Sequence, residues 1–181
     1  ALTGLWTSVT TGDFDGDGRL DIVAGNWGLN SFYGRSVAGP WRLYYGDLNG
    51  DGQVHLLEAY PNEALKQVTP FRGMELVGTV MPWVRERLPT HKAYARASVA
   101  EILGERMAKA KELAVVELRS MIFLNRGDRF EARPLPVEAQ WTPAMGSNVG
   151  DFDGDGHEDI FLRQNFFAVR TEDNRLDAGR G

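Results

Sequence analysis

The sequence predicts a mainly β fold that is built from a repeated acidic loop and interrupted by a helical insertion. Three segments, beginning at Asp13, Asp47 and Asp151, share one acidic pattern, and an apolar run of strand length follows each of them. Between the second and third segments, apolar side chains recur at the 3.6-residue spacing of a helix. We therefore expect short strands joined by repeated loops, with the helices confined to one stretch.

The strands predicted after the three loops lie at 20–24, 54–59 and 160–162. A further pair of strands, at 117–124 and 129–135, flanks Asn125-Arg-Gly-Asp128 and is typical of a hairpin.

The helical stretch is predicted over 73–114. Its first part contains Pro82, which either starts a second helical piece or kinks a single helix. Ser98 and Glu101 have the spacing of a capping box, and apolar residues continue along one face as far as Met107. The sequence therefore predicts a helix from Ser98 to about residue 113.

Charge is distributed unevenly along the 181 residues, in which 20 Lys and Arg face 25 Asp and Glu. Twelve of the 25 acidic residues lie in the three loop segments, so the rest of the chain is mildly basic. Carboxylates this crowded repel one another unless a cation lies among them. The net charge of −5 is thus explained by cation sites and gives no reason to expect a basic partner.

Several classes of protein are excluded by composition. The absence of cysteine excludes disulfide frameworks, thiolate zinc sites and cysteine nucleophiles. No apolar run is long enough for a membrane span. The basic residues outside the loops are scattered or lie on predicted helix faces, so no nucleic-acid partner is expected.

Each loop, numbered from its first Asp, carries a side-chain oxygen at positions 1, 3 and 5 and a glycine at position 6. The oxygens come from Asp13, Asp15 and Asp17, from Asp47, Asn49 and Asp51, and from Asp151, Asp153 and Asp155. Position 7 offers a backbone carbonyl, from Arg19, Gln53 and His157, and position 9 adds the carboxylates of Asp21 and Asp159. This spacing lets a tightly turning backbone point alternate oxygens at a hard cation.

Calcium is the cation that this donor set predicts, because it takes roughly six to eight oxygen ligands, whereas magnesium demands a stricter octahedron. Asp-Gly clusters also form turns without a metal, but three copies favour the calcium interpretation. The second loop departs from the pattern, because its position 9 is His55 and imidazole is a poor calcium ligand. Glu58, at its position 12, is either a bidentate ligand or only a strand residue.

An EF-hand sensor is the alternative calcium protein, but its loop needs Glu at position 12 and a helix on each side. Position 12 is Ala24 in the first loop and Leu162 in the third, and the flanks are strand-like. A static calcium that stabilises the fold is the better hypothesis.

The first and third loops, Asp13-Phe-Asp-Gly-Asp-Gly-Arg-Leu-Asp-Ile and Asp151-Phe-Asp-Gly-Asp-Gly-His-Glu-Asp-Ile, resemble the calcium loops of FG-GAP/VCBS repeats. Such repeats form the blades of integrin-alpha-like β-propellers. The segments 25–31, 89–95 and 134–140 further resemble bacterial VCBS-repeat proteins related to the CRTAC1 and ASPIC/UnbV group.

The resemblance implies a partial β-propeller of antiparallel blades with calcium loops, in an extracytoplasmic protein (periplasmic, secreted or at the cell surface). On this basis we expect two blades over 1–72 with calcium loops at 13–21 and 47–58, the helical insertion over 73–114, and a further blade over 115–181 with a calcium loop at 151–159. Propellers of this kind have about seven blades. The chain is therefore expected to be part of a longer protein and to contact its neighbouring blades.

No catalytic constellation is recognisable. The three histidines have no spacing relation, and no nucleophile elbow, His-Glu-x-x-His motif or phosphate-binding glycine loop occurs. We therefore expect no enzyme activity in this chain, but a calcium-binding scaffold or recognition module for protein or carbohydrate. The alternative is part of a propeller enzyme whose catalytic residues lie outside this sequence.

Overall fold

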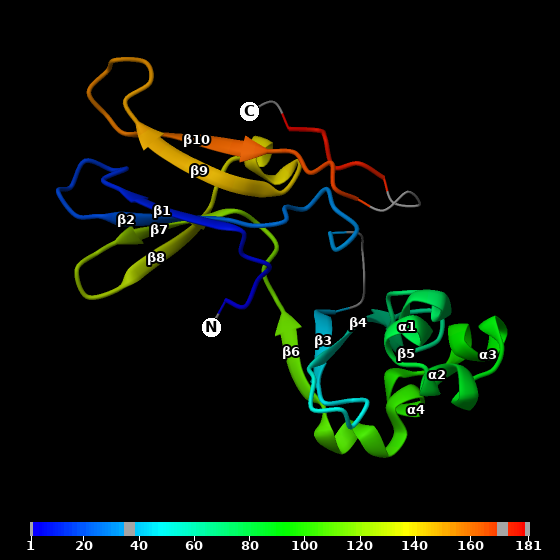
Figure 1. Ribbon diagram of the computed structural model, residues 1–181. Helices are drawn as coiled ribbons and strands as arrows, with labels where there is room; N and C mark the ends of the chain where they lie inside the picture. Colours follow the sequence, from blue (N-terminus) through cyan, green and yellow to red (C-terminus); the bar gives the residue numbers. More distant parts are fainter. Residues whose placement is uncertain (1, 35–38, 170–173, 180–181) are drawn as a thin grey trace. The chain divides into compact units, whose positions relative to one another are not determined.

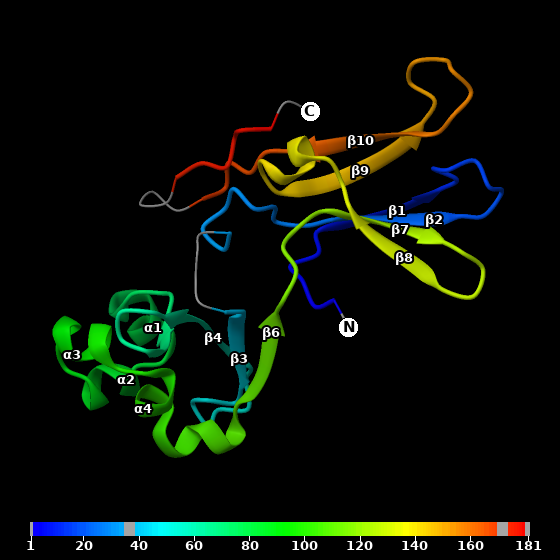
Figure 2. The same ribbon diagram turned by 180° about the vertical axis from the view of Figure 1, so that it is seen from behind.

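The computed structural model describes residues 2–34, 39–169 and 174–179. The chain divides into two compact units, one of which is inserted into the other along the sequence. The inserted unit comprises residues 36–116, and the discontinuous unit comprises residues 2–35 and 117–181. Figures 1 and 2 show the strands and helices of each unit from two sides.

The discontinuous unit contains a four-stranded antiparallel sheet and a two-stranded one (Figure 1). The larger sheet has the order β1 (Ser8–Gly12), β2 (Asp21–Gly25), β7 (Met121–Asn125) and β8 (Phe130–Pro134). The smaller one pairs β9 (Ala144–Gly150) with β10 (Asp159–Gln164). Strands that are almost a hundred residues apart therefore become neighbours, since Val23 of β2 pairs with Ile122 of β7.

A small apolar cluster lies between these two sheets. Val23 is wholly buried and packs with residues of β7, β10 and the short 3-10 helix η2 (Val137–Gln140). The other members of the cluster are Leu135, Ala139, Phe14, Ile122, Ile160 and Leu162. Successive side chains of a strand point to opposite faces of its sheet. The apolar faces of the β1–β2 and β9–β10 hairpins therefore pack against each other.

The inserted unit contains a second four-stranded antiparallel sheet and a group of short helices. Its strand order is β5 (Gln67–Pro70), β4 (His55–Asn62), β3 (Trp41–Gly46) and β6 (Lys111–Val115). Its helices are α1 (Met74–Val80), α2 (Trp83–Arg87), α3 (His91–Arg96), α4 (Val99–Leu103) and the 3-10 helix η1 (Gly104–Lys109). Leu57 of the sheet and Ile102 of α4 are both almost fully buried in one core cluster.

The predicted strands after the three loops are confirmed by β2, β4 and β10, and the predicted hairpin by β7 and β8. The mainly β character with antiparallel sheets and a few helices is likewise confirmed. Pro82 separates two helices, because α1 ends at Val80 and α2 begins at Trp83.

The prediction of one helix from Ser98 to about residue 113 was wrong. The α-helix ends at Leu103, because Gly104 adopts a φ of +52° and the chain continues as a 3-10 turn. Residues 111–115 then form β6, in which Leu113 pairs with Leu43 of β3. Strand pairing therefore overrides the helical tendency of this segment.

The boundaries of the two compact units do not coincide with those of the predicted ranges 1–72, 73–114 and 115–181. The first acidic loop shares its unit with the third, and the second lies in the inserted unit together with the helices. Among the described residues, no helix is long and apolar enough to cross a membrane.

The capping box of α4 gives a first testable prediction. Ser98 Oγ accepts a hydrogen bond from the Glu101 N–H at 3.1 Å, and the Glu101 carboxylate accepts one from the Ser98 N–H at 2.7 Å. Replacing Ser98 with Ala should lower the free energy of unfolding by about 1 kcal/mol. Urea denaturation measures this loss, and Ser98→Thr, which keeps a capping hydroxyl, is the control. Equal stability of S98A and the unaltered chain would contradict the prediction.

Candidate metal centres

The three acidic segments lie in loops between paired antiparallel strands, as expected from the sequence. Loop 1 (13–21) joins β1 to β2, loop 2 (47–58) runs from the end of β3 into β4, and loop 3 (151–159) joins β9 to β10. Loops 1 and 3 belong to the discontinuous unit, and loop 2 belongs to the inserted unit.

The carboxylate at position 1 organises each loop by accepting backbone hydrogen bonds from positions 5 and 6. Asp13 accepts from Asp17 at 3.0 Å and from Gly18 at 2.9 Å. The corresponding donors to Asp47 are Asp51 and Gly52, at 2.9 and 3.1 Å, and those to Asp151 are Asp155 and Gly156, at 3.1 and 2.9 Å. Three sequence-distant loops therefore have the same internal fold.

Glycines at positions 4 and 6 make this tight turn possible. All six have a positive φ, between 72° and 88°, and they are Gly16, Gly18, Gly50, Gly52, Gly154 and Gly156. A Cβ at any of these glycines meets no atom within 4 Å, so their conformation, and not crowding, requires glycine.

The carboxylate at position 9 closes loops 1 and 3. Asp159 Oδ2 accepts from the Phe152 N–H at 3.0 Å, and Asp21 Oδ2 accepts from the Phe14 N–H at 3.2 Å. Asp21 is wholly buried and also accepts from the Asn125 N–H of β7 at 2.7 Å. Loop 1 is thus tied to the neighbouring strand.

The side chains predicted to hold a metal are brought together in part. In loop 1, oxygens of Asp13, Asp15 and Asp17 lie within 4.8 Å of one another. In loop 3, oxygens of Asp151, Asp153 and Asp159 do so. Such clusters of carboxylate oxygen fit a hard divalent cation.

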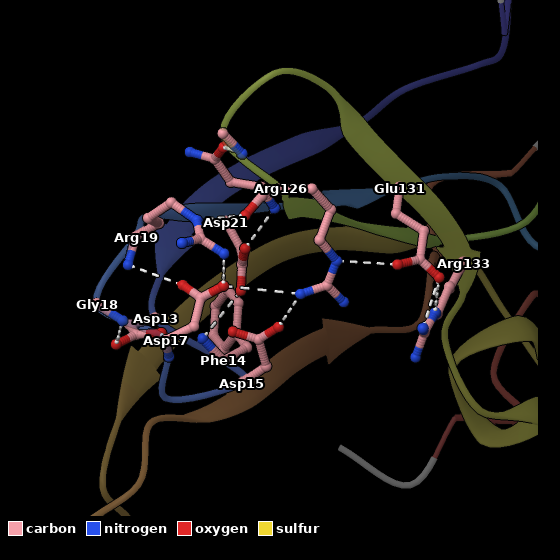
Figure 3. Close-up of polar contacts among 12 residues, drawn as sticks. Asp13, Phe14, Asp15, Asp17, Gly18, Arg19, Asp21, Arg126, Glu131 and Arg133 are labelled. Atoms are coloured by element: carbon pink, nitrogen blue, oxygen red, sulfur yellow. Dashed lines mark hydrogen bonds and ion pairs between the residues drawn. The ribbon is translucent and has the colours of Figure 1, made fainter.

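Loop 1 differs from loop 3 because arginines face its carboxylates (Figure 3). Arg126, in the turn between β7 and β8, contacts Asp15 Oδ2 at 2.5 Å and lies 3.7 Å from Asp17 Oδ2. Its Nε also donates to Glu131 at 2.9 Å. The Arg126 guanidinium holds the pKa of Asp15 below its usual range. Asp17 additionally pairs with Arg19.

Loop 2 presents fewer oxygens than the sequence predicts. Asn49 Oδ1 accepts from the Trp83 indole N–H at 2.9 Å, so the position 3 oxygen is engaged by α2. Glu58 forms an ion pair with Arg72 at 2.6 Å. Asp47, Asp51 and His55 lie close together, with one possible ligand atom of each within 4.8 Å of the others. Although desolvation acts in the opposite direction, backbone N–H donors hold the pKa of Asp47 below its usual range.

Two residues near loop 1 were missed by the sequence analysis. Arg126 is 111 residues from Asp15 in the chain, and no local pattern connects them. Glu158, in loop 3, accepts a hydrogen bond from the Asp13 N–H at 2.5 Å. Its acidic side chain next to Asp159 was a visible signal, but its partner depends on how the two hairpins pack.

Comparison with known proteins identifies one repeat family. The family model described as FG-GAP repeat matches residues 5–38, which include β1, loop 1 and β2. Searches among curated proteins and among solved structures found no match. The chain therefore contains an FG-GAP repeat at residues 5–38.

Proposed function

We propose that this chain is a calcium-binding segment of a β-propeller-like protein, with one calcium ion in loop 1 and one in loop 3. The observation that carries the proposal is the shared geometry of these loops, in which positions 1 and 9 accept the same backbone hydrogen bonds in both copies. The FG-GAP repeat found over loop 1 suggests a β-propeller-like extracellular module.

The ligands proposed for loop 1 are the carboxylates of Asp13, Asp15, Asp17 and Asp21 and the carbonyl of Arg19. Those proposed for loop 3 are the carboxylates of Asp151, Asp153, Asp155 and Asp159 and the carbonyl of His157. Calcium in such a loop would neutralise the crowded carboxylates and hold the two flanking strands together. The residues themselves preform the turn, because their backbone N–H donors are already paired with carboxylates.

The role proposed for the module is that of an extracytoplasmic scaffold or recognition surface for protein or carbohydrate. The antiparallel sheet formed by β1, β2, β7 and β8 has the strand number and sequential order of a propeller blade, which supports this role. We assign no reaction to the chain, since the crowded acidic residues are explained as cation ligands.

Isothermal titration calorimetry with single-loop variants tests the metal proposal. Calcium should bind the unaltered chain at two sites, and Asp15→Ala or Asp153→Ala should each remove one of them. A stoichiometry that is the same in both variants and in the unaltered chain would contradict the assignment to loops 1 and 3.

The two sites should also differ in affinity. Because Arg126 lies among the carboxylates of loop 1, calcium must compete with its guanidinium there, whereas the described contacts of loop 3 include no such arginine. Arg126→Gln in a D153A background should therefore tighten calcium binding to loop 1 by about tenfold, which corresponds to about 1.4 kcal/mol.

Arg133→Gln is the matched control, because Arg133 pairs with Glu131 and, among the described residues, makes no polar contact with loop 1. It should leave the affinity of loop 1 unchanged. Unchanged calcium affinity in R126Q would show that the guanidinium does not compete with the cation.

A further inference from the structure

An acidic side chain in loop 3 reaches the start of loop 1. Glu158 occupies position 8, where loop 1 carries Leu20 and loop 2 carries Val54. All three residues are exposed, and position 8 lies outside the pattern of oxygen donors at positions 1, 3, 5, 7 and 9. The glutamate of loop 3 therefore has no explanation within its own loop.

The contact is a hydrogen bond between the two loops of the discontinuous unit. Glu158 Oε2 accepts from the Asp13 N–H at 2.5 Å, although the two residues are 145 positions apart in the sequence. An ionised acceptor makes such a bond stronger than a neutral pair does. Figures 1 and 2 both show the β1–β2 and β9–β10 connections at the same end of this unit. Glu158 thus joins two loops that are distant in the chain.

Gly12, which precedes loop 1, leaves the space that the Glu158 carboxylate occupies. It is buried and has no positive φ, yet a Cβ there would displace Glu158 Oε2 and meet the Phe14 ring. At Gly150, the matching residue before loop 3, the nearest atom to such a Cβ belongs to the Phe152 ring, at an ordinary 3.4 Å. Of these two glycines, the one at loop 1 is therefore required by the close approach of a carboxylate.

A second contact holds the same end of loop 1. Phe14 packs against the apolar cluster to which Ile160 and Leu162 of β10 also belong, and β10 is the strand that follows Glu158. The Phe14 N–H donates to Asp21 Oδ2 at 3.2 Å, which closes loop 1. The first two residues of loop 1 are thus held both by its own closing carboxylate and by the hairpin that carries loop 3.

Closure of loop 3 keeps Glu158 in place. Its neighbour Asp159 closes loop 3 by accepting from the Phe152 N–H at 3.0 Å. Residues 151–158 are all exposed, so few contacts besides the hydrogen bonds within the loop hold it closed. Opening of loop 3 moves Glu158 and frees the N–H of Asp13, the residue whose carboxylate organises loop 1.

We propose that Glu158 links loops 1 and 3, so that each loop closes more readily when the other is closed. A hydrogen bond that exists only when both loops are closed supplies a coupling free energy, and such coupling acts equally in both directions. The link itself needs no metal. Its consequence for metal rests on the calcium function proposed above: an ion that closes one loop should raise the calcium affinity of the other by about tenfold.

Amide hydrogen exchange of the full chain in EDTA tests the link without metal. Glu158→Ala should raise the exchange rates of the Asp17 and Gly18 N–H groups about tenfold, because loop 1 then opens more often. The matching N–H groups of loop 2, which belongs to the other unit, should be unchanged. Glu158→Gln keeps an acceptor oxygen but loses the charge, so it should raise the rates less than Glu158→Ala does.

Glu138→Ala is the matched control for these variants. Glu138 is an exposed residue of η2 in the same unit, and its side chain makes no polar contact among the described residues. The replacement should leave the exchange rates of loop 1 unchanged. Circular dichroism checks that each variant is folded.

A calcium titration followed by NMR tests the coupling of the two metal sites. The Gly18 amide reports on loop 1 and the Gly156 amide on loop 3, since each donates to the first carboxylate of its loop. Asp153→Ala, which removes the ion from loop 3, should weaken calcium binding at loop 1 about tenfold. In an E158A background the same replacement should leave the affinity of loop 1 unchanged.

Two results would overturn the proposal. One is loop 1 exchange in EDTA that E158A leaves unchanged or that E138A raises equally, and the other is an effect of D153A on loop 1 that is the same with and without Glu158. If the chain bound no calcium, the calcium function would fail while the exchange rates in EDTA still decided the link. Two bound ions together with unchanged exchange in E158A would leave the calcium function intact and reject the link.

Discussion

Removing calcium with EDTA should lower the melting temperature of the discontinuous unit, and adding calcium should restore it. This result is expected because an ion that binds only the folded loops stabilises them by RT ln(1 + [L]/Kd), about 2.7 kcal/mol for each site at a hundredfold excess over Kd. Differential scanning calorimetry measures the shift. With two sites in one unit, the two ions together should add about 5 kcal/mol to its free energy of unfolding at this excess.

The double variant Asp15→Ala/Asp153→Ala should lose most of this calcium response. These residues are suited to the test because the described backbone hydrogen bonds to Asp15 and Asp153 are few, whereas Asp13 and Asp151 each organise a turn. Asp128→Ala removes an exposed carboxylate outside the loops and is the control. A melting temperature that is the same in EDTA and in calcium would contradict the metal assignment.

Asp21→Ala should destabilise the calcium-free chain far more than Asp159→Ala does. Asp21 is wholly buried and accepts from the N–H groups of Phe14 and Asn125, so its removal leaves two donors without their partner. The expected loss in the free energy of unfolding is about 3 kcal/mol.

Asp159 is the matched residue of the second copy and separates this structural role from metal binding. Asp159 is more exposed than Asp21, and its described hydrogen bond is the one from the Phe152 N–H. Its replacement should therefore lower the free energy of unfolding by about 1 kcal/mol or less. Urea denaturation in EDTA measures both variants. Equal losses would show that the bond from Asp21 to β7 does not stabilise the sheet.

The local features of this protein were predictable from its sequence. The spacing of Asp and Gly in each loop determines which carboxylates and backbone N–H groups meet, because all of them lie within nine residues. The apolar runs after the loops likewise predict β2, β4 and β10, and the capping box predicts the start of α4.

The pairing of distant strands was not predictable in the same way. Whether β2 pairs with β3 or with β7 depends on which edge is free after folding, and the residues between them form a separate unit. Leu113 shows the same effect on a smaller scale, since its pairing with Leu43 outweighs the helical spacing that precedes it.

The same distinction applies to the sites. The carboxylates come from within each loop, but the groups that alter their chemistry come from elsewhere in the chain. Arg126 reaches loop 1 from the turn between β7 and β8, and Trp83 reaches Asn49 of loop 2 from α2. Their influence depends on tertiary packing, which spacing along the sequence does not encode.

A crystal structure determined with saturating calcium tests whether loops 1 and 3 hold the ion. We expect one ion in loop 1 and one in loop 3, each coordinated by the oxygens of positions 1, 3, 5, 7 and 9 at about 2.3–2.6 Å, directly or through water. In that structure Arg126 should have moved away from Asp15. Loops 1 and 3 without an ion at saturating calcium, with Arg126 still paired with Asp15, would contradict it.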